Sequence, residues 1–293
     1  MAIVRALRPD ETMPEAVLAD YQARMEQRPA LPPASTPGLG RLVLETDAGP
    51  VGLLVYQRPP GHPATAHLLF YHALSEAGGQ VLLAEALAAL MRWAERVVAS
   101  GRPADAAWDL GRWGFDRLER LTMARDLAAF AAPAPLLPNG YLATPLVPAH
   151  VPDLVRPALS ANAGTIDNQL LPVSPEDVER RLADFAAGTI EGPPVDRGAS
   201  LTMLFTGTPI GAILVRRCSP SLGLLDDIFV APEHQGRGLG HSLILLVLRT
   251  LRADGAERVE VETARHLGAY HLLRRLGFTA VAERPVYFWL RLG

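Results

Sequence analysis

The sequence predicts an α/β protein with two tandem domains, each a mixed, mostly antiparallel sheet flanked by helices. Three observations lead to this fold class. The 293 residues correspond to about two domains of ordinary size. Strand patterns and apolar helix patterns follow one another along each half of the chain. Short segments of the first half also recur in the same order in the second half, which favours a duplicated domain.

The repeats set the expected domain boundaries. Each half begins with a short strand pattern and a helix pattern, and a proline-rich stretch between the halves is typical of a linker. We therefore expect a first domain at residues 1–131, a linker at 132–140 and a second domain at 141–293. The recurring pairs of segments are 7–17 with 146–155, 49–58 with 208–217, and 112–115 with 275–278.

The individual elements follow from hydrophobic periodicity, and the second half shows the order β-α-β-β-β-α-β-α-β-β. Prolines and glycines interrupt residues 164–198 around one helix pattern, so this region is either a mobile loop over a site or an extended connection. The expected strands are 42–46, 51–57, 66–71, 201–206, 210–216, 224–230, 258–262 and two within 279–292, and the expected helices of the second half are 175–187, 238–253 and 266–276.

Composition excludes several classes of function. The formal net charge of −3 argues against a dedicated binder of nucleic acid or of an anionic membrane surface. All 28 basic residues are arginine, so Schiff-base chemistry, a lysine-bound pyridoxal cofactor and a Walker-type phosphate loop are excluded. A single cysteine, Cys218, forms neither an internal disulfide nor a thiolate zinc site. No histidine cluster has metal-ligand spacing, so no metal is expected.

The chain carries no pattern of a secreted or membrane protein. Charged residues lie where the apolar core of a secretory signal would be, and the densest apolar run, residues 243–248, is too short to cross a bilayer. We therefore expect a cytoplasmic protein with no membrane partner.

The stretch from Leu224 to His241 carries the most chemical information. A strand ends at Pro232, and a glycine-rich turn then opens a long apolar helix. Such a turn presents unpaired backbone N–H groups at the positive end of a helix dipole, which suits a diphosphate. The Rossmann pattern of glycines fails because His241 stands at its last position. An ordinary tight turn that caps a helix is the alternative.

These residues resemble the signature of the GNAT acetyltransferase superfamily, Gln/Arg-x-x-Gly-x-Gly/Ala after a strand that ends in Val-x-Pro. Gln235, Gly238 and Gly240 match it, and Val230 and Pro232 precede it. The resemblance covers the chain from about 141 to 292 and implies acetyl-coenzyme A as co-substrate. It implies that the main chain of Ile228, Phe229 and Val230 pairs with the pantetheine arm, and that the pyrophosphate is held by Gln235, Gly236, Arg237, Gly238, Leu239, Gly240 and His241.

A later family motif, Asn-x-x-Ala-x-x-Leu-Tyr-x-x-x-Gly-Phe, matches only in part. His266 stands in place of the asparagine, where the resemblance implies a cofactor contact, and Leu273 replaces the tyrosine that often protonates the departing thiolate. On a continuous helix His266, Tyr270 and Leu273 share one face, so we expect Tyr270 to take over as the acid. The alternative is that Tyr270 packs in the core.

Most primary amines are protonated at pH 7, and an ammonium has no lone pair with which to attack a thioester, so a base is needed. Adjacent carboxylates in an apolar strand are costly to bury unless they are used or paired. We favour Asp226 over Asp227 as the base, and we expect the two side chains to face opposite sides of the sheet. The alternative is that both pair with arginines. Glu260 and Glu262 either attract a cationic substrate or face solvent.

The first half lacks the glycine spacing after its third apolar strand, and residues 106–115 leave little room for the helix that precedes Gly-Phe in the second half. We therefore expect a degenerate copy with a structural role. The second half is expected to transfer an acetyl group from acetyl-coenzyme A to a primary amine of a small molecule by direct attack. Two alternatives stay open: a silent acyl-coenzyme A binding or regulatory protein, and an acetyltransferase like mycothiol synthase. Its assembly is expected to be a monomer with an internal pseudo-dimer, or a homodimer.

Overall fold

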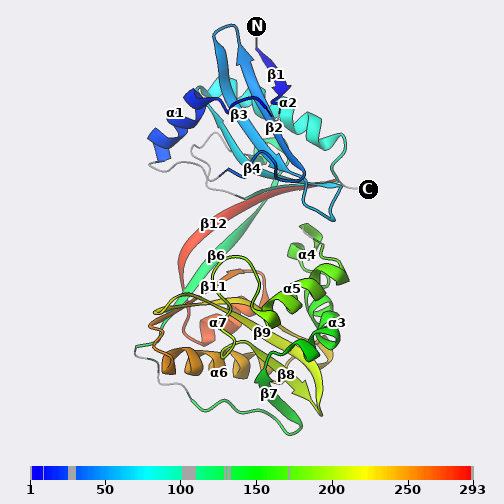
Figure 1. The fold of residues 1–293 in the computed structure, drawn as a ribbon, viewed down its shortest axis with the longest axis vertical. Coiled ribbons are helices and arrows are strands. Elements are labelled where there is room, and N and C mark those ends of the chain that lie inside the picture. The colour runs from blue at the N-terminus through cyan, green and yellow to red at the C-terminus, as the bar shows by residue number, and fades with distance from the viewer. Residues whose placement is uncertain are drawn as a thin grey trace. The chain divides into compact units, whose positions relative to one another are not determined.

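The computed structural model describes residues 2–8, 10–25, 31–100, 110–128, 130, 133–170 and 172–291. Its packing divides the chain into two compact units. Unit 1 comprises Met1–Glu119 together with Arg284–Gly293, and unit 2 comprises Arg120–Glu283. Figure 1 labels the elements of both units.

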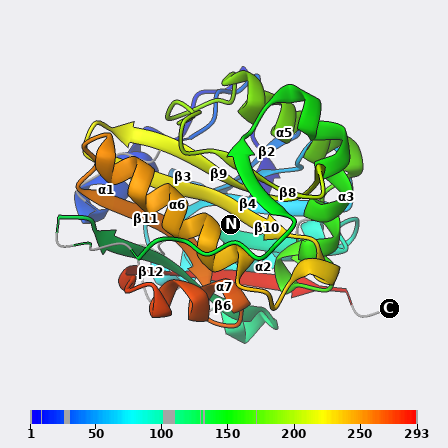
Figure 2. The same ribbon diagram turned by 90° about the horizontal axis from the view of Figure 1, so that it is seen from below.

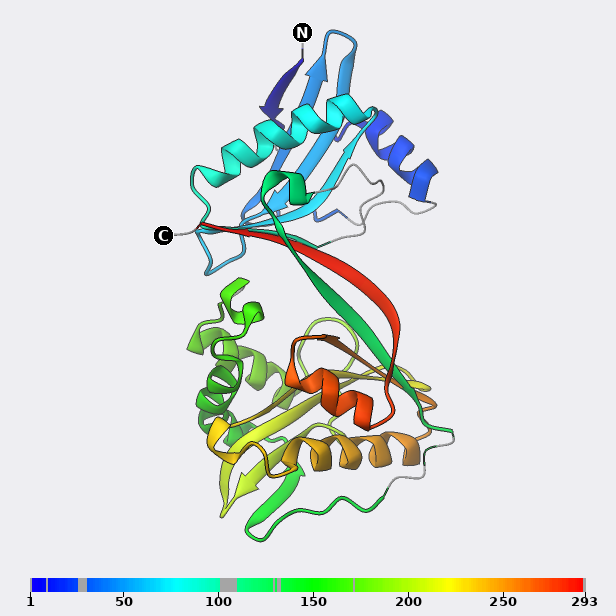
Figure 3. The ribbon, with the colours of Figure 1, turned by 180° about the vertical axis from the view of Figure 1, so that it is seen from behind.

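Unit 1 is a six-stranded sheet in the order β1-β2-β3-β4-β5-β12. Helix α2 packs on one face through Leu82, Leu87 and Leu90, and helix α1 packs on the other face through Val17 (Figure 3). Only β4 and β5 run parallel among the strand pairs described in this unit. Its elements are β1 (Ile3–Ala6), α1 (Glu15–Met25), β2 (Leu39–Thr46), β3 (Gly49–Gln57), β4 (Thr65–Ala73), α2 (Glu76–Met91), β5 (Arg96–Ser100) and the 3-10 helix η2 (Leu110–Trp113).

Unit 2 is a six-stranded sheet in the order β6-β11-β10-β9-β8-β7, in which β10 and β11 form the parallel pair. Helices α6 and α7 cover one face and helices α3 and α5 the other (Figure 2). Its elements are β6 (Asp116–Asp126), β7 (Tyr141–Pro145), η3 (Pro148–His150), α3 (Val151–Asn162), α4 (Ile166–Leu170), α5 (Pro175–Ala187), β8 (Leu201–Phe205), β9 (Thr208–Ser219), β10 (Leu222–Val230), η4 (Pro232–His234), α6 (Leu239–Ala253), β11 (Arg258–Ala264) and α7 (Gly268–Arg275). The last strand, β12 (Thr279–Leu290), begins in unit 2 and continues into the sheet of unit 1.

The two units share one irregularity in their fourth strands. In β10 the pairing with β9 shifts between Leu225 and Asp227, so Asp226 is an extra, bulged residue. In β4 the same shift makes Leu69 the bulged residue. In each unit the parallel pairing stops at the residue before the bulge, at Leu225 and at Leu68. The shared bulge supports duplication, because it recurs at the same point of both sheets.

The last strand of each half pairs outside its own half. Strand β6 pairs with β11 of unit 2 from Arg120 to Asp126, and β12 pairs with β5 of unit 1 from Val286 to Leu290. The compact units therefore divide inside β6 and inside β12, whereas the sequence placed the boundary at the linker. Local patterns locate a strand but not its partner, which explains the difference. Residues 131 and 132, at the expected boundary, lie outside the described residues.

Several expected elements match the structure closely. The helix expected at 175–187 is α5, and the helix expected at 238–253 is α6 with Gly255 just beyond its end at φ 85°. The fold class is confirmed in both sheets, which are mixed, mostly antiparallel and flanked by helices. Among the helices that the structure describes, none is long and apolar enough to cross a bilayer.

Three expectations need correction or limits. The segment 279–290 is one continuous strand rather than two, because it extends from unit 2 into unit 1 without a turn. Helix α7 begins at Gly268, two residues later than expected, because His266 lies in the turn after β11. In the first half, the short η2 stands where the second half has α7, and residues 106–109 lie outside the described part of the chain.

Candidate active site

The start of α6 is open to solvent. The N-cap residue Gly238 has φ 77°, and no side-chain cap bond is found at this helix start within the described residues. Gly236 also has a left-handed φ of 73°, and a Cβ on either glycine would enter open space. Glycine is therefore needed here for its backbone conformation rather than for room. The first-turn N–H groups have no intrahelical partner and carry the positive end of the helix dipole, which suits an anion.

Two contacts fix this loop on the sheet. The side-chain amide of Gln235 donates to the carbonyl of Val230 over 2.8 Å, which ties the loop to the end of β10. The ring of His234 lies 5.0 Å from the ring of Phe205, and its Nδ1 is 2.9 Å from the Tyr141 hydroxyl. Gln235 thus acts within the loop as a brace, while His234 joins the loop to β7 and β8.

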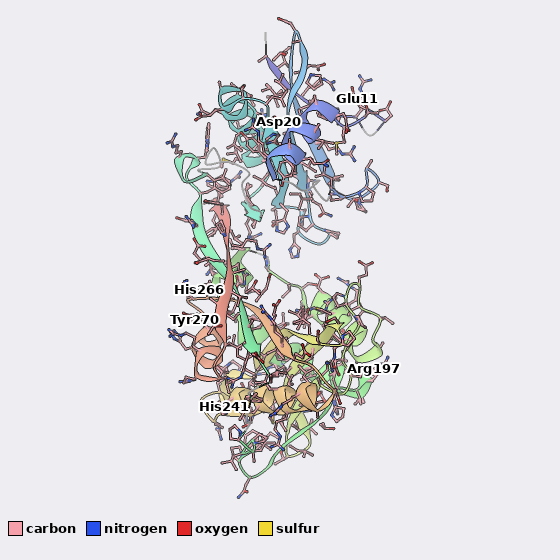
Figure 4. All side chains as sticks on the ribbon, turned by 90° about the vertical axis from the view of Figure 1, so that its left-hand side faces the viewer. Glu11, Asp20, Arg197, His241, His266 and Tyr270 are labelled. Atoms are coloured by element: carbon pink, nitrogen blue, oxygen red, sulfur yellow. The ribbon has the colours of Figure 1, made fainter. Side chains whose placement is uncertain are left out.

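The remaining loop residues predicted to hold the diphosphate are close together at the helix start. Gln235, Gly236, Arg237, Gly238 and His241 are exposed, and Leu239 is buried under the first turn of α6. Figure 4 shows His241 on α6. These positions fit a bound diphosphate, because exposed backbone N–H groups from one turn converge there.

One edge of β10 is left without a strand. The pairing of β10 with β11 ends at Leu225 and Val261, whereas β11 continues beside β6 to Ala264. Within the described residues, no strand pairs with Ile228, Phe229 and Val230 on the β11 side, where the sequence expects the pantetheine arm. Ile228 packs with the α6 face and Phe229 with the α3 and α5 face, so the backbone between them faces along the sheet. An extended ligand can add to this edge as a strand does.

Asp226 and Asp227 lie on the same face of the sheet, contrary to the expected opposite faces. The bulge breaks the alternation of side chains, so both carboxylates turn toward α5. There Arg181 donates to both: Nη2 lies 2.7 Å from Asp226 Oδ2, and Nη1 lies 3.0 Å from Asp227 Oδ2. Arg216 Nε approaches the other oxygen of Asp226 at 2.8 Å. Both oxygens of Asp226 are therefore held by cations.

The electrostatics of the two carboxylates differ. Burial raises the pKa of Asp227, and this effect outweighs the lowering by Arg181 and by the backbone N–H of Ile228, although 27% of the side chain is exposed. For Arg181, burial opposes the charge, but Asp227 and Asp226 outweigh it and raise the pKa of the guanidinium. Asp227 is thus the carboxylate that accepts a proton more readily than an ordinary aspartate.

His266 lies in the turn between β11 and α7, and Tyr270 lies on α7 (Figure 4). His266 is exposed in the turn before the helix, so it does not share a helix face with Tyr270. Tyr270 is half-buried against the core, and Arg265 Nη1 lies 3.4 Å from its hydroxyl. Leu273, at the position of the family's tyrosine, is 2% exposed and belongs to the core.

Sequence reasoning missed Arg181 and Arg216 as partners of the carboxylates. The pattern Leu-Leu-Asp-Asp-Ile-Phe contained a usable signal, because two adjacent polar residues inside an apolar strand indicate a bulge. Nothing local marked Arg181, which lies 45 positions before Asp226. Its neighbour one helical turn later, Phe185, packs beneath the Arg216 guanidinium, which is 5.2 Å from the ring.

The equivalent helix start in unit 1 is filled by the chain itself. Ser75 caps α2, and its hydroxyl accepts from the N–H of Gly78 over 3.2 Å. A Cβ on Gly79 would lie 2.4 Å from the Tyr71 hydroxyl, so that hydroxyl sits beside the first turn. Only Leu74 and Ser75 separate β4 from α2, whereas eight residues separate β10 from α6. This start offers no loop around a diphosphate.

Comparisons with known proteins agree with this geometry. Residues 171–278 match the model of the Acetyltransferase (GNAT) family. Mycothiol acetyltransferase from Pseudarthrobacter chlorophenolicus is 32% identical over 183 residues, which cover 60% of this chain and 54% of that protein. The chain thus spans about half the length of this curated relative.

Solved structures extend the similarity to the whole fold. A GCN5-related N-acetyltransferase from Sphaerobacter thermophilus superposes with a TM-score of 0.62 at 17% identity, over 100% of this chain and 96% of that one. A tandem GNAT protein from the clavulanic acid biosynthesis pathway gives 0.55 at 18% identity, over 100% and 99%. At such identities the likeness concerns the fold alone. Residues 171–278 thus match the GNAT family model, and the whole fold resembles that of solved GNAT proteins, a tandem GNAT protein among them.

Proposed function

We propose that unit 2 transfers an acetyl group from acetyl-coenzyme A to a primary amine of a small molecule by direct attack. The observation that carries this proposal is the start of α6, where the two left-handed glycines leave the first-turn N–H groups open to a diphosphate. The unpaired edge of β10 continues from that point toward the carboxylates at the bulge. Diphosphate, pantetheine arm and thioester would thus meet loop, strand edge and bulge in that order.

The reaction needs one proton acceptor and profits from one proton donor. The amine nitrogen bonds to the thioester carbonyl carbon, the carbon–sulfur bond breaks, the ammonium proton goes to a base and the sulfur gains a proton. Among the two candidate bases, the geometry favours Asp227 over Asp226, which the sequence favoured. Asp226 has both oxygens on guanidinium groups, whereas burial raises the pKa of Asp227 toward the working range of a base.

Tyr270 is the proposed donor to the sulfur. Tyr270 is half-buried, and its hydroxyl has a cationic neighbour in Arg265 at 3.4 Å, while the buried Leu273 offers no proton. After each turnover, the phenolate of Tyr270 can take up a proton from solvent. The thiol of coenzyme A is a tolerable leaving group, so the donor accelerates the reaction without being essential.

The acceptor has two candidates. A small-molecule amine without further specification follows from the family, and an aminoacyl-sugar acceptor, as in a mycothiol-synthase-like enzyme, is favoured by the 32% identity with mycothiol acetyltransferase. The mixed charges of Arg181, Asp226 and Asp227 suit a polar, cationic acceptor rather than an apolar one. Nucleic acid is not expected as a partner.

The test combines binding with turnover. Coenzyme A binding is measured by calorimetry, and release of free thiol is followed with acetyl-coenzyme A and a panel of primary amines that includes aminoacyl sugars. We expect one coenzyme A per chain and thiol release with at least one amine. Binding without turnover for every amine supports a silent acyl-coenzyme A binding protein instead, and no binding rejects the assignment of the loop.

A further inference from the structure

One buried hydroxyl in unit 2 has no partner. Thr263 is 2% exposed, and its Oγ1 makes no hydrogen bond to any part of the chain that the structure describes. Buried polar groups in folded proteins are nearly always bonded, and a hydroxyl that is desolvated without a bond costs free energy. A threonine kept at such a position therefore needs a reason beyond packing, because valine has nearly the same shape and no polar atom.

Thr263 lies just beyond the point where β10 and β11 separate. Val261 is the last residue of β11 that pairs with β10, and Thr263 follows two positions later on the same face of the sheet. On its other side β11 is still paired, and Leu121 of β6 lies directly opposite Thr263. Both Val261 and Leu121 belong to the core beneath α6 and α7. The hydroxyl is therefore on the inner side of the strand that borders the separation.

The residues of β10 that face β11 where the two strands separate lie close to the start of α6. Ile228 of β10 is on the same face, and a Cβ on Gly240 would lie 3.9 Å from its Cδ1 and 3.3 Å from Leu272 Cδ2. Strand β10, the first turn of α6 and helix α7 thus meet at this point. A ligand that runs from the α6 start along the β10 edge has the β11 residues as its other neighbour.

From this placement we propose that Thr263 Oγ1 is a hydrogen-bonding contact for the acyl-pantetheine arm, through an amide or the thioester carbonyl. The proposal rests on the proposed function, since it assumes that the arm lies along β10. It explains why the hydroxyl has no partner in the free protein: the ligand supplies the missing bond. Thr263 is then a positioning residue, because it orients the arm and exchanges no proton or acyl group.

The test uses two variants at Thr263 and one matched control. Thr263→Val removes the hydroxyl and keeps the shape, and Thr263→Ser keeps the hydroxyl. Thr202 is also buried, but its hydroxyl lies 3.1 Å from His150 Nδ1, so Thr202→Val removes a hydroxyl that is already bonded. Affinities for coenzyme A and for adenosine 3′,5′-bisphosphate, which lacks the pantetheine arm, are measured by calorimetry, and the melting temperature is measured without ligand.

We expect Thr263→Val to weaken coenzyme A binding about 3- to 10-fold, to leave the affinity for adenosine 3′,5′-bisphosphate unchanged, and to keep or raise the melting temperature. Thr263→Ser should bind coenzyme A within about twofold of the parent. Thr202→Val should lower the melting temperature with both affinities unchanged. An unchanged affinity of Thr263→Val for coenzyme A overturns the proposal, as does an equal loss for both ligands. If the parent itself binds no coenzyme A, the proposed function fails first.

Discussion

Asp226 and Asp227 follow one another in a strand, yet their carboxylates lie on one face of the sheet and share the guanidinium of Arg181. The bulge in β10 causes this, because Asp226 is an extra residue without its own partner in β9, which breaks the alternation of side chains between the two faces. The pair unites two different environments: one carboxylate held by two cations, and one whose pKa burial raises.

Replacing the base should separate chemistry from binding. We expect Asp227→Asn to lower kcat about 100- to 10,000-fold, because an amide takes no proton, while coenzyme A affinity stays unchanged. Steady-state kinetics with the best amine and calorimetry measure the two effects. Asp226→Asn is the matched variant on the same face and should have the smaller effect on kcat. A larger loss in Asp226→Asn would assign the base to Asp226.

The pH profile of the parent enzyme is a second test of Asp227 as the base. Burial raises the folded pKa of Asp227 above 3.8, and only the deprotonated form accepts a proton, so kcat/KM should fall as the pH drops through a value above that of an ordinary aspartate. The acidic limb should be absent from the residual activity of Asp227→Asn. A limb that persists unchanged in this variant would belong to another group.

The glycine at the N-cap of α6 gives a test of the loop. Gly238→Val should weaken coenzyme A binding at least tenfold, or about 1.4 kcal/mol, because valine disfavours the left-handed φ of 77° and shifts the first-turn amides. Gly164, with φ 76° and open space around its Cβ position, gives the control. Gly164→Val should cost similar stability and leave the affinity intact. Equal affinities of both variants would reject the loop as the diphosphate site.

Tyr270 is tested by removal of its hydroxyl alone. Tyr270→Phe keeps the ring against the core and should lower kcat up to about 100-fold, since a protonated sulfur leaves more easily. Coenzyme A affinity should not change. Acyl donors with more acidic thiols provide the control, because they should lose less rate in this variant. An equal loss for all donors would place Tyr270 in the core and outside the chemistry.

The Ser75 cap of helix α2 should stabilise unit 1, and its removal should leave ligand binding unaffected. Ser75→Ala removes the side chain that accepts from Gly78 and should cost about 1 kcal/mol of stability, seen as a lower melting temperature. Coenzyme A affinity and stoichiometry should stay at the parent values. A changed stoichiometry would show that the helix start in unit 1 also binds the ligand.

The stability of unit 1 should also depend on pH through Asp20. His72, 3% exposed, is hydrogen bonded to Asp20 over 2.7 Å, and this bond is the main cause that lowers the pKa of Asp20 below 3.8. A folded pKa below the unfolded one adds stability that is present above 3.8 and is lost as the pH falls through the folded value. Asp20→Asn should therefore melt below the parent at pH 6, and the difference should shrink at pH 3. Asp10→Asn, at an exposed aspartate of the same unit, is the control substitution.

Much of this structure could be predicted from local sequence patterns. Helix α5 has the expected bounds, and α6 differs from expectation by one residue, because periodic apolar positions and flanking glycines mark helices directly. Proline and glycines likewise marked the loop before α6. The pairing of β6 with β11 and of β12 with β5 could not be predicted, since hydrogen bonds between distant strands leave no trace in either strand alone.

The candidate site divides in the same way. The glycine loop could be predicted, because its chemistry depends on consecutive residues. The partner of the carboxylates could not, because Arg181 reaches Asp226 through the packing of a helix on a sheet. Thr263 could not be predicted for a further reason: the proposal for it depends on a buried hydroxyl without a hydrogen bond, which only the three-dimensional structure shows.

The exchange of final strands makes the two halves mutually dependent. A polypeptide that starts at Tyr141 would lack β6 and expose the hydrogen-bonding edge of β11 along seven residues. Exposed strand edges of this kind promote aggregation. A polypeptide that stops before the linker would in turn deprive β5 of β12. Neither half is therefore complete without the other, since each supplies the strand that pairs with the edge of the other half's sheet.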